Sequence, residues 1–389
     1  MKRLRTMVVT VSRADYGLLY PLIVKLNEDT GFETIVTATG NHLSQLHGNT
    51  IQKLQDDGIV IGHMVEMPMT GDTGRDVCNS MAAGLSAFSD ILAAEKPDLI
   101  IVLGDRYELW PVCMSAAIFR VPVAHIHGGE VTYGAVDEVI RHSVTKMSLI
   151  HFPSIDLYRQ RIIQMGESPD RVFAVGALGI DNVRNIELMN KRELSLYTGA
   201  DFENPTAIMT YHPVTLDDYD SASQQVKEVL EALLASPVFT IVTMPNSDVG
   251  GTSVYKTIYE YAEKYSDRFK IIKNLGQKAY LSTMEHARFM IGNSSSGIIE
   301  SASFKLPVVN IGDRQQGRFK PNNVIDCICS RGEIINAIKK ALSEDFIQSV
   351  SGMKNPYGDG KTAERIVDIL KSFDFRDKNL LKKKFYNKY

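Results

Sequence analysis

The sequence has few cysteines, no excess of basic charge and no long hydrophobic run. Only four cysteines occur in 389 residues: Cys78 and Cys113 are isolated, and the C-x-C pair Cys327 and Cys329 lacks the second pair of a zinc site. We therefore expect four reduced thiols, which is typical of a cytoplasmic protein, and no disulfide scaffold. Lysine and arginine together number 43 and aspartate and glutamate 46, so the net charge is −3, which argues against a general nucleic-acid-binding protein.

A membrane partner is not expected either. No stretch approaches the ~18 uninterrupted apolar residues of a membrane span. Residues 1–5 are rich in basic side chains and residues 7–11 are apolar, as in a signal peptide, but the apolar run is short and residues 12–15 interrupt it at once. We predict a first β-strand at residues 7–11 and a protein that stays in the cytoplasm.

The common nucleotide-cofactor fingerprints are also missing. No G-x-G-x-x-G follows the first predicted strand, which argues against a nicotinamide-dependent dehydrogenase. Residues 360–362 read Gly-Lys-Thr, like the end of a P-loop, but Asn355 stands where the first glycine of that loop belongs. His125 and His127 lie two apart and could form a metal pair, yet no third ligand follows at a usable spacing. We therefore expect no metal and no cofactor.

What the sequence does contain is a repeated alternation of short apolar runs and longer helical patterns. Uninterrupted apolar segments such as Leu99–Leu103 are typical of parallel strands covered on both faces. The alternation predicts an α/β fold with two Rossmann-like, doubly wound domains. It restarts after a polar stretch at residues 182–205, so we place one domain at residues 1–185 and the other at 186–361. Residues 362–389 follow as a helix and a basic tail, and we expect the tail to be a solvated end.

Polar clusters follow five of the predicted strands. They occupy residues 12–17, 104–108, 125–130, 211–215 and 292–297. In doubly wound sheets, ligands bind outside the carboxyl ends of the strands. Because the five clusters come from both halves of the chain, they predict a binding cleft between two domains.

Some of these residues suit a phosphate group. Residues 292–297 combine glycines that allow close approach, serine hydroxyls and a following helix N-terminus, although plain N-capping by a serine is the alternative. Arg13, Arg106 and Arg314 each lie beside a turn and could pair with phosphate oxygens, but a single arginine in such a place more often forms a surface ion pair. His212, held by the proline that follows it, could contact a phosphate or be structural.

Other residues suit proton transfer. Asp105 follows one apolar strand, and Glu130 and Asp137 follow another. A closing cleft raises the pKa of a carboxyl group into the range that acid–base catalysis uses. Each of the three could instead be a helix cap or an ion-pair partner.

Taken together, these motifs resemble those of the UDP-N-acetylglucosamine 2-epimerases, in particular the hydrolysing branch that begins sialic and related nonulosonic acid synthesis. The resemblance covers nearly the whole chain and includes residues 48–50, 137–146, 212–213, 245–248 and 312–315 besides the clusters above. It implies a glycosyltransferase-B-like fold, a final helix that returns to the first domain, and a dimer or tetramer. It also implies that UDP-N-acetylglucosamine and water give N-acetylmannosamine and UDP without a cofactor, by elimination of UDP and readdition of water with inversion at C2.

The resemblance also assigns roles to residues. Asp105 and Asp137 match the catalytic aspartates of the family. Animal-type relatives read H-I-E-G-G-E where this chain has His127, whereas bacterial relatives share H-I-H-G-G-E, so we expect His127 to act on the sugar and Glu130 to support or replace it. The residues implied to contact the UDP moiety are Arg13, Gly17, Arg106, His212, Asn246, Leu275, Ser294, Ser295, Glu300 and Arg314.

Several alternatives share these motifs. A hydrolysing 2-epimerase of UDP-2,4-diacetamido-2,4,6-trideoxyglucose, on the route to legionaminic acid, would differ only in the pocket around C4 and C6 of the sugar. A transferase of the same fold would need an acceptor site, and a sugar-nucleotide sensor would bind without turnover. A non-hydrolysing epimerase matches residues 104–106 and 125–130 less well than the hydrolysing branch does.

Overall fold

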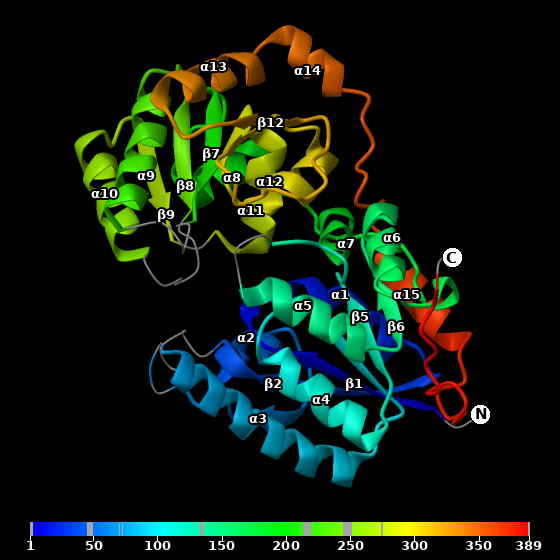
Figure 1. Ribbon diagram of the computed structural model, residues 1–389. Helices are drawn as coiled ribbons and strands as arrows, with labels where there is room; N and C mark the ends of the chain where they lie inside the picture. Colours follow the sequence, from blue (N-terminus) through cyan, green and yellow to red (C-terminus); the bar gives the residue numbers. More distant parts are fainter. Residues whose placement is uncertain are drawn as a thin grey trace. The chain divides into compact units, whose positions relative to one another are not determined.

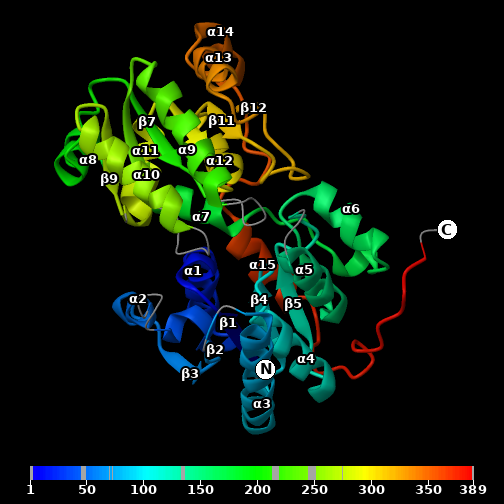
Figure 2. The ribbon, with the colours of Figure 1, turned by 60° about the vertical axis from the view of Figure 1, so that its left-hand side comes forward.

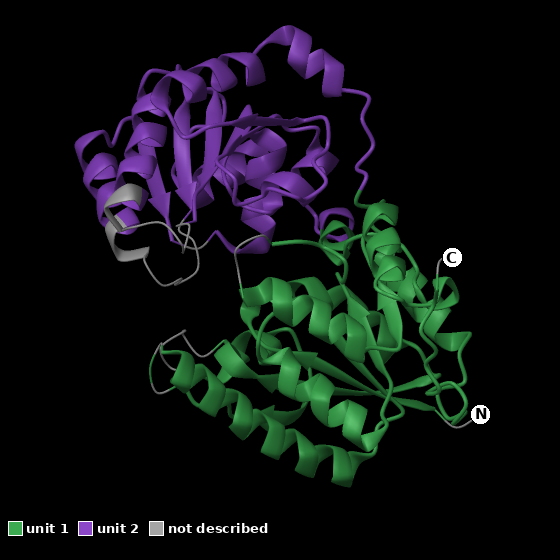
Figure 3. Ribbon diagram, in the orientation of Figure 1, with its two compact units in different colours: residues 1–182, 357–389 green, residues 183–356 purple. Residues whose placement is uncertain are grey.

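The chain folds into two compact units, each built on its own sheet (Figures 1 and 3). Unit 1 comprises Met1–Asn182 and Tyr357–Tyr389, and unit 2 comprises Val183–Pro356. The computed structural model describes residues 3–44, 50–69, 71, 73–132, 136–212, 219–243, 251–273 and 275–387. The predicted α/β class, with two Rossmann-like units, is confirmed.

Unit 1 contains a six-stranded sheet in the order β3-β2-β1-β4-β5-β6, with every neighbouring pair parallel. The strands are β1 (Leu4–Thr10), β2 (Phe32–Thr39), β3 (Ile61–Val65), β4 (Leu99–Leu103), β5 (Val123–Ile126) and β6 (Ile150–Phe152). The strand order reverses between β1 and β4, which is where doubly wound sheets bind ligands.

Helices cover both faces of this sheet. The helices of unit 1 are α1 (Arg13–Glu28), η1 (Gly40–Leu43), α2 (Ile51–Asp56), α3 (Gly74–Glu95), α4 (Leu109–Phe119), α5 (Val136–Met147), α6 (Asp156–Gln164), η3 (Pro169–Arg171) and α15 (Thr362–Lys371). The helix α7 (Leu178–Asn185) begins in unit 1 and ends in unit 2. Alternation along β1 separates two cores: Val8 packs with residues of α1 and α15, whereas Met7 and Val9 pack with residues of α3, α4 and α5. In Figure 1, α3, α4 and α5 lie on the near side of the sheet.

Unit 2 repeats the same connectivity, with the sheet order β12-β11-β10-β7-β8-β9. Its strands are β7 (Thr206–Thr210), β8 (Phe239–Thr243), β9 (Phe269–Ile272), β10 (Phe289–Gly292), β11 (Val308–Ile311) and β12 (Val324–Cys327). Its helices are α8 (Lys191–Thr198), α9 (Tyr219–Leu234), α10 (Gly251–Lys264), α11 (Gly276–His286), α12 (Ser296–Ile299), η4 (Ser301–Phe304), α13 (Arg331–Ala341) and α14 (Glu344–Val350). The order reverses here between β7 and β10.

Some elements are absent from the sequence-based prediction. The strands β3 and β12 lie at sheet edges and keep exposed positions, so they lack the uninterrupted apolar run of a central strand. The stretch 182–205, which reads as polar, contains the end of α7 and all of α8. A capping box between Asn190 and Glu193 begins α8 and was a signal that the sequence offered.

The C-terminal tail is solvated over most of its described residues, as expected, but it is not a free end. Lys383 Nζ lies 2.6 Å from Glu167 Oε2 and donates to the carbonyl oxygens of Lys146 and Ser148, both at 2.8 Å. Glu167 is 1% exposed, and a buried carboxylate requires cationic or hydrogen-bonding partners. The tail therefore docks on unit 1 as an extended segment after α15, drawn in red in Figure 2.

The helix α3 is long and apolar enough, by length and composition alone, to cross a membrane. It carries polar residues within its span, among them Asn79 and Asp90. The residues Ser80, Gly84, Phe88 and Leu92 recur every fourth position and are buried. Because this stripe packs into unit 1, we interpret α3 as a helix that covers the sheet.

Candidate functional site

At the carboxyl end of β1, a capping box shapes the start of α1. The Asp15 carboxylate accepts hydrogen bonds from Thr10 Oγ1 (2.7 Å), Ser12 Oγ (2.6 Å) and the Val11 N–H (3.0 Å). This arrangement leaves Arg13 exposed as the first residue of the helix. Gly17 follows one turn later, and a side chain there would meet open space. The predicted residues Arg13 and Gly17 thus lie at the switch point of the first sheet.

The carboxyl end of β4 supplies Arg106 to the same switch point. Its side chain is 40% exposed, and its guanidinium pairs at 3.3 Å with Glu108, whose side chain is 0% exposed. Burial raises the pKa of Glu108, and the positive charge of Arg106 opposes that rise. The pKa of Arg106 is raised because the charges of Glu108, Asp15 and Asp137 outweigh its burial. Arg106 therefore stays positive while a buried carboxylate fixes its orientation.

A buried arginine that the sequence analysis did not select joins the predicted acid–base residues. Arg141, 2% exposed on α5, forms an ion pair with Asp105 and donates to the His127 carbonyl oxygen at 3.2 Å. It also donates to Thr132 Oγ1 at 3.0 Å and lies 3.9 Å from Glu130 Oε2. Arg141 lies one helical turn after Asp137, and this i, i+4 spacing was the signal available in the sequence.

The loop after β5 holds His127 in an uncommon backbone conformation. Its φ is +63°, in the left-handed region, and its N–H donates to the Phe152 carbonyl at 3.1 Å. Nδ1 of His127 lies 3.6 Å from Glu130 Oε1, and both side chains are nearly buried. Glycine is required at position 129, where a Cβ would lie 2.4 Å from the Tyr158 carbonyl oxygen. The backbone thus places His127 and Glu130 as a close pair.

Asp137 lies in the first turn of α5 and is exposed to solvent. Its pKa is raised because surrounding atoms disfavour its charge and because the negative charge of Asp105 is near, while Arg106 and Arg141 oppose the rise. Unit 1 therefore brings Asp105, His127, Glu130 and Asp137 together around Arg141.

His125 does not have the environment of a metal ligand. It is 0% exposed, its Nε2 lies 2.8 Å from the Gly104 carbonyl oxygen, and its Nδ1 lies 3.1 Å from Thr145 Oγ1. Burial lowers the pKa of His125 to about 3, so the ring is neutral and Nε2 is the nitrogen that donates to the carbonyl. Among the described residues, no group of three histidine, cysteine, aspartate or glutamate side chains could hold a metal ion.

In unit 2, the loop after β10 contains the predicted phosphate cradle. A side chain at Gly292 (φ +134°) would place Cβ 2.0 Å from the Thr210 carbonyl oxygen, so only glycine fits. The helix that follows, α12, is four residues long and starts after Ser295, whose side chain makes no capping bond. Ser294 is nearly buried, and its hydroxyl accepts weakly from the Ser296 N–H at 3.4 Å. The geometry is compatible with both the cradle and a partial capping role.

Two further predicted UDP contacts, Arg314 and Glu300, lie beside this loop. Arg314 Nη1 donates to the Asn293 carbonyl at 3.1 Å, and Glu300 directly follows α12. The side chain of Leu275 packs in the core, and its carbonyl oxygen accepts from Tyr197, so it could contact a ligand only through its main chain. Asn246 lies outside the described residues, as do residues 48–49, 213–215 and 245–248 of the motifs.

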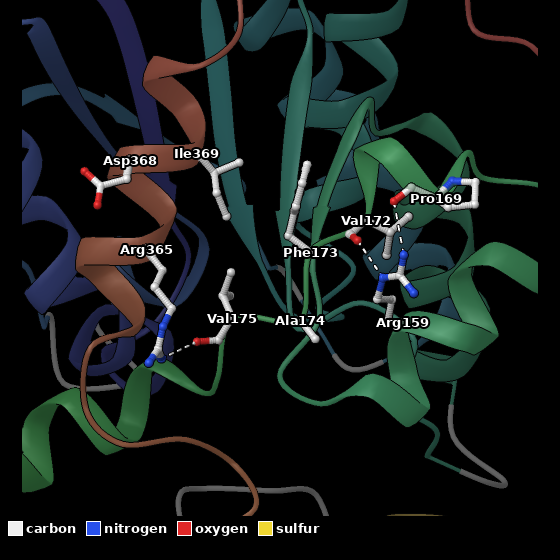
Figure 4. Close-up of a pocket in the computed structure, with 9 residues that line it drawn as sticks. All are labelled: Arg159, Pro169, Val172, Phe173, Ala174, Val175, Arg365, Asp368 and Ile369. Atoms are coloured by element: carbon white, nitrogen blue, oxygen red, sulfur yellow. Dashed lines mark hydrogen bonds between the residues drawn. The ribbon is translucent and has the colours of Figure 1, made fainter.

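A separate cavity of about 550 Å³ lies at the edge of the first sheet (Figure 4). It is lined by Arg159, Pro169, Val172, Phe173, Ala174, Val175, Arg365, Asp368 and Ile369. Arg159 donates to the Val172 carbonyl at 2.9 Å, and Arg365 donates to the Val175 carbonyl at 3.1 Å. Both arginines thus hold main-chain segments, and the cavity contains none of the predicted site residues.

Comparison with solved structures supports the fold. A crystal structure of UDP-GlcNAc 2-epimerase from Neisseria meningitidis, bound to UDP-GlcNAc, superimposes with a TM-score of 0.82. The match covers 95% of this chain and 100% of that chain at 17% sequence identity.

Sequence comparison adds the family. This chain is 34% identical to a UDP-N,N'-diacetylbacillosamine 2-epimerase (hydrolyzing) of Legionella pneumophila, over 96% of this chain and 97% of the relative. It is 36% identical to a GDP/UDP-N,N'-diacetylbacillosamine 2-epimerase (hydrolyzing) of Campylobacter jejuni, over 90% of each. It is 34% identical to the polysialic acid biosynthesis protein P7 of Escherichia coli, over 98% and 97%. A family model described as UDP-N-acetylglucosamine 2-epimerase matches residues 24–371, and the chain therefore belongs to the UDP-N-acetylglucosamine 2-epimerase family.

Proposed function

We propose that this chain is a hydrolysing 2-epimerase of UDP-2,4-diacetamido-2,4,6-trideoxyglucose, which is UDP-N,N'-diacetylbacillosamine. Its products would be UDP and the free sugar with the manno configuration at C2. Two relatives named for this substrate, at 34% and 36% identity, support it over UDP-N-acetylglucosamine, which the motifs alone placed first. UDP-N-acetylglucosamine remains the second candidate because of the family's description and the polysialic acid relative.

The observation that carries the epimerase proposal is the acid–base cluster around Arg141. Inversion at C2 requires one group that removes a proton and another that returns a proton from the opposite face of the sugar. Asp105, His127 and Asp137 provide three such groups from three segments of unit 1. Arg141 contacts Asp105 and the backbone of His127, so one buried cation fixes two of the three.

The proposed reaction has two stages. In the first, a base removes the C2 proton as the bond between C1 and the UDP oxygen breaks, leaving a glycal-like intermediate. In the second, the hydroxyl of water adds to C1 and a proton is delivered to C2 from the other face. The pKa of Asp137 is raised, mainly by desolvation, which is the direction that a general acid requires. Glu130, 3.6 Å from the His127 ring, favours a positive charge on that ring.

The UDP group would be bound by cations and hydroxyl donors. We assign Arg106 and Arg314 to the pyrophosphate, Ser294 and Ser295 to its oxygens, and Glu300 to the ribose hydroxyls. Negative charge develops on the leaving phosphate as the bond to C1 breaks, and fixed positive partners lower the energy of that transition state.

Proton NMR in D2O tests the reaction and the substrate together. Purified protein is incubated separately with each of the two UDP-sugars, without added cofactor. We expect UDP and a free manno sugar with deuterium at C2, formed faster from the diacetamido substrate. Faster turnover of UDP-N-acetylglucosamine would reverse the substrate assignment, and no turnover of either would contradict the epimerase proposal.

A further inference from the structure

The switch point of the second sheet is bridged by one side chain. Gly292 is the last residue of β10 and pairs with Thr210, the last residue of β7. Beyond these residues the two segments leave the sheet, because β10 continues into the serine loop and β7 into residues 211 and 212. Asn293 lies at this point and is 1% exposed.

The Asn293 side chain makes two hydrogen bonds to the backbone of His212. Its Oδ1 accepts from the His212 N–H at 2.7 Å, and its Nδ2 donates to the His212 carbonyl oxygen at 2.8 Å. A side-chain amide has the same donor and acceptor as a peptide group, so this contact extends the parallel ladder past its last strand pair. His212 is thereby tied to the first residue of the serine loop.

The main chain of Asn293 forms hydrogen bonds with a third segment. Its carbonyl oxygen accepts from Arg314 Nη1 at 3.1 Å and from Gln315 Nε2 at 2.8 Å. Gln315 is 2% exposed, so this contact is shielded from water. The segments that follow β7, β10 and β11 therefore meet at one residue.

We propose that Asn293 is a positioning residue for the UDP group. The inference rests on the proposed function, which assigns Arg314 and the neighbouring Ser294 to UDP. These groups and His212 come from three separate connections, and Asn293 fixes them in one arrangement before the ligand arrives. Donors that are already in place lose little freedom on binding, and this preorganisation increases affinity.

The test measures UDP affinity by isothermal titration calorimetry on the full-length chain. We expect Asn293→Ala to weaken UDP binding by roughly tenfold or more, because the His212 N–H and carbonyl lose their buried partners. Asn293→Asp keeps the acceptor for the His212 N–H but places an oxygen against the His212 carbonyl. The Asn293→Asp variant should therefore bind UDP more weakly as well. If the alanine variant does not fold, the UDP affinity of the aspartate variant tests the positioning role.

Asn323→Ala is the matched control. Asn323 is 0% exposed, and its Nδ2 donates to the Leu306 carbonyl at 2.7 Å and to Ser301 Oγ at 2.9 Å, near the amino ends of β11 and β12. We expect this variant to lower the thermal unfolding temperature while keeping UDP affinity. Equal affinity losses at both asparagines, or an unchanged affinity in the folded Asn293 variants, would overturn the positioning role alone. A wild-type protein that does not bind UDP would overturn the proposed function as well.

Discussion

At the scale of single residues, the candidate site depends on charges held away from water. Arg141 is 2% exposed and meets Asp105, which is 36 positions away in the sequence. His127 and Glu130 are also nearly buried and lie 3.6 Å apart. Buried ionisable groups that face one another shift each other's protonation, which is why such clusters serve proton transfer.

The pair His127 and Glu130 allows a direct test of the acid–base assignment. We expect His127→Ala to lower kcat by roughly a hundredfold or more, because it removes a group that moves a proton. Glu130→Gln should cause a smaller loss and shift the pH profile of kcat, because the His127 ring loses its negative neighbour. Steady-state kinetics over a pH range measures both effects.

His63→Ala is the control for this experiment. His63 lies on the edge strand β3 and pairs with Glu95 at 3.0 Å, away from the predicted site residues in the sequence and the sheet order. The His63→Ala variant should have the same kcat as the wild-type protein. Full activity in both His127→Ala and Glu130→Gln would show that neither residue takes part in the chemistry.

At the scale of elements, the C-terminal tail is fastened to the sheet by a buried carboxylate. Burial opposes the ionisation of Glu167, but hydrogen bonds from His151, Lys146 and Lys383 outweigh it and lower its pKa to about 2. Burial also lowers the pKa of His151, although the hydrogen bond and negative charge of Glu167 oppose that shift. An ionised Glu167 therefore holds β6, the end of α5 and the tail together.

This network predicts a dependence of stability on pH. A lowered folded-state pKa contributes stability that is present above the ordinary value of 4.5 and is lost as pH falls toward about 2. His151 acts in the same direction below its ordinary value of 6.5, because protonation then favours the unfolded chain. Chemical unfolding between pH 7 and pH 3 should show falling stability, with a shallower fall in Glu167→Gln.

Lysine substitutions in the tail distinguish the contact between Lys383 and Glu167 from the general effect of removing a positive charge. Lys383→Met should lower the free energy of unfolding at pH 7 by about 2 kcal/mol, because buried Glu167 loses one of its cations. Lys382→Met is the matched control, since Lys382 Nζ bonds only the exposed Asn379 side chain at 2.8 Å among its described contacts. Equal stability of the two variants would contradict the docking role of Lys383.

At the scale of the whole molecule, two sheets of the same connectivity hold different chemistry. Unit 1 gathers the acid–base residues, together with Arg106, at the ends of β4 and β5, and unit 2 gathers hydroxyl, amide and arginine groups at the ends of β7, β10 and β11. Each set lies at the carboxyl ends of its own sheet. We therefore expect substitutions of the acid–base residues to lower catalysis and substitutions of the UDP-binding residues of unit 2 to lower nucleotide affinity, with Arg106 contributing to affinity from unit 1.

Two arginines test this division. Arg141→Lys keeps a positive charge but loses the planar fork, so we expect kcat to fall by roughly a hundredfold with UDP affinity nearly unchanged. Arg314→Ala should instead weaken UDP binding by roughly tenfold, because a phosphate partner is lost. Steady-state kinetics measures kcat and calorimetry measures UDP affinity for both variants. Equal effects of the two substitutions on UDP affinity would argue against separate roles.

Much of the architecture could be predicted from the sequence alone. Apolar runs such as Leu99–Leu103 mark buried parallel strands, and the polar clusters after them mark the ends of the sheet. The family resemblance rested on the same clusters and was confirmed at the level of the family. These features are local, because hydrophobic pattern and turn composition act over a few neighbouring residues.

The tertiary structure alone decided which distant side chains meet. Arg141 with Asp105, Asn293 with His212 and Lys383 with Ser148 are separated by 36, 81 and 235 positions. The partners of a buried charge or amide are the groups that the tertiary fold places next to it. The hydrophobic periodicity of the sequence does not predict which groups these are. The sequence therefore determined the central strands, their ends and the family, whereas packing determined the edge strands and the partners that hold the site and the tail in place.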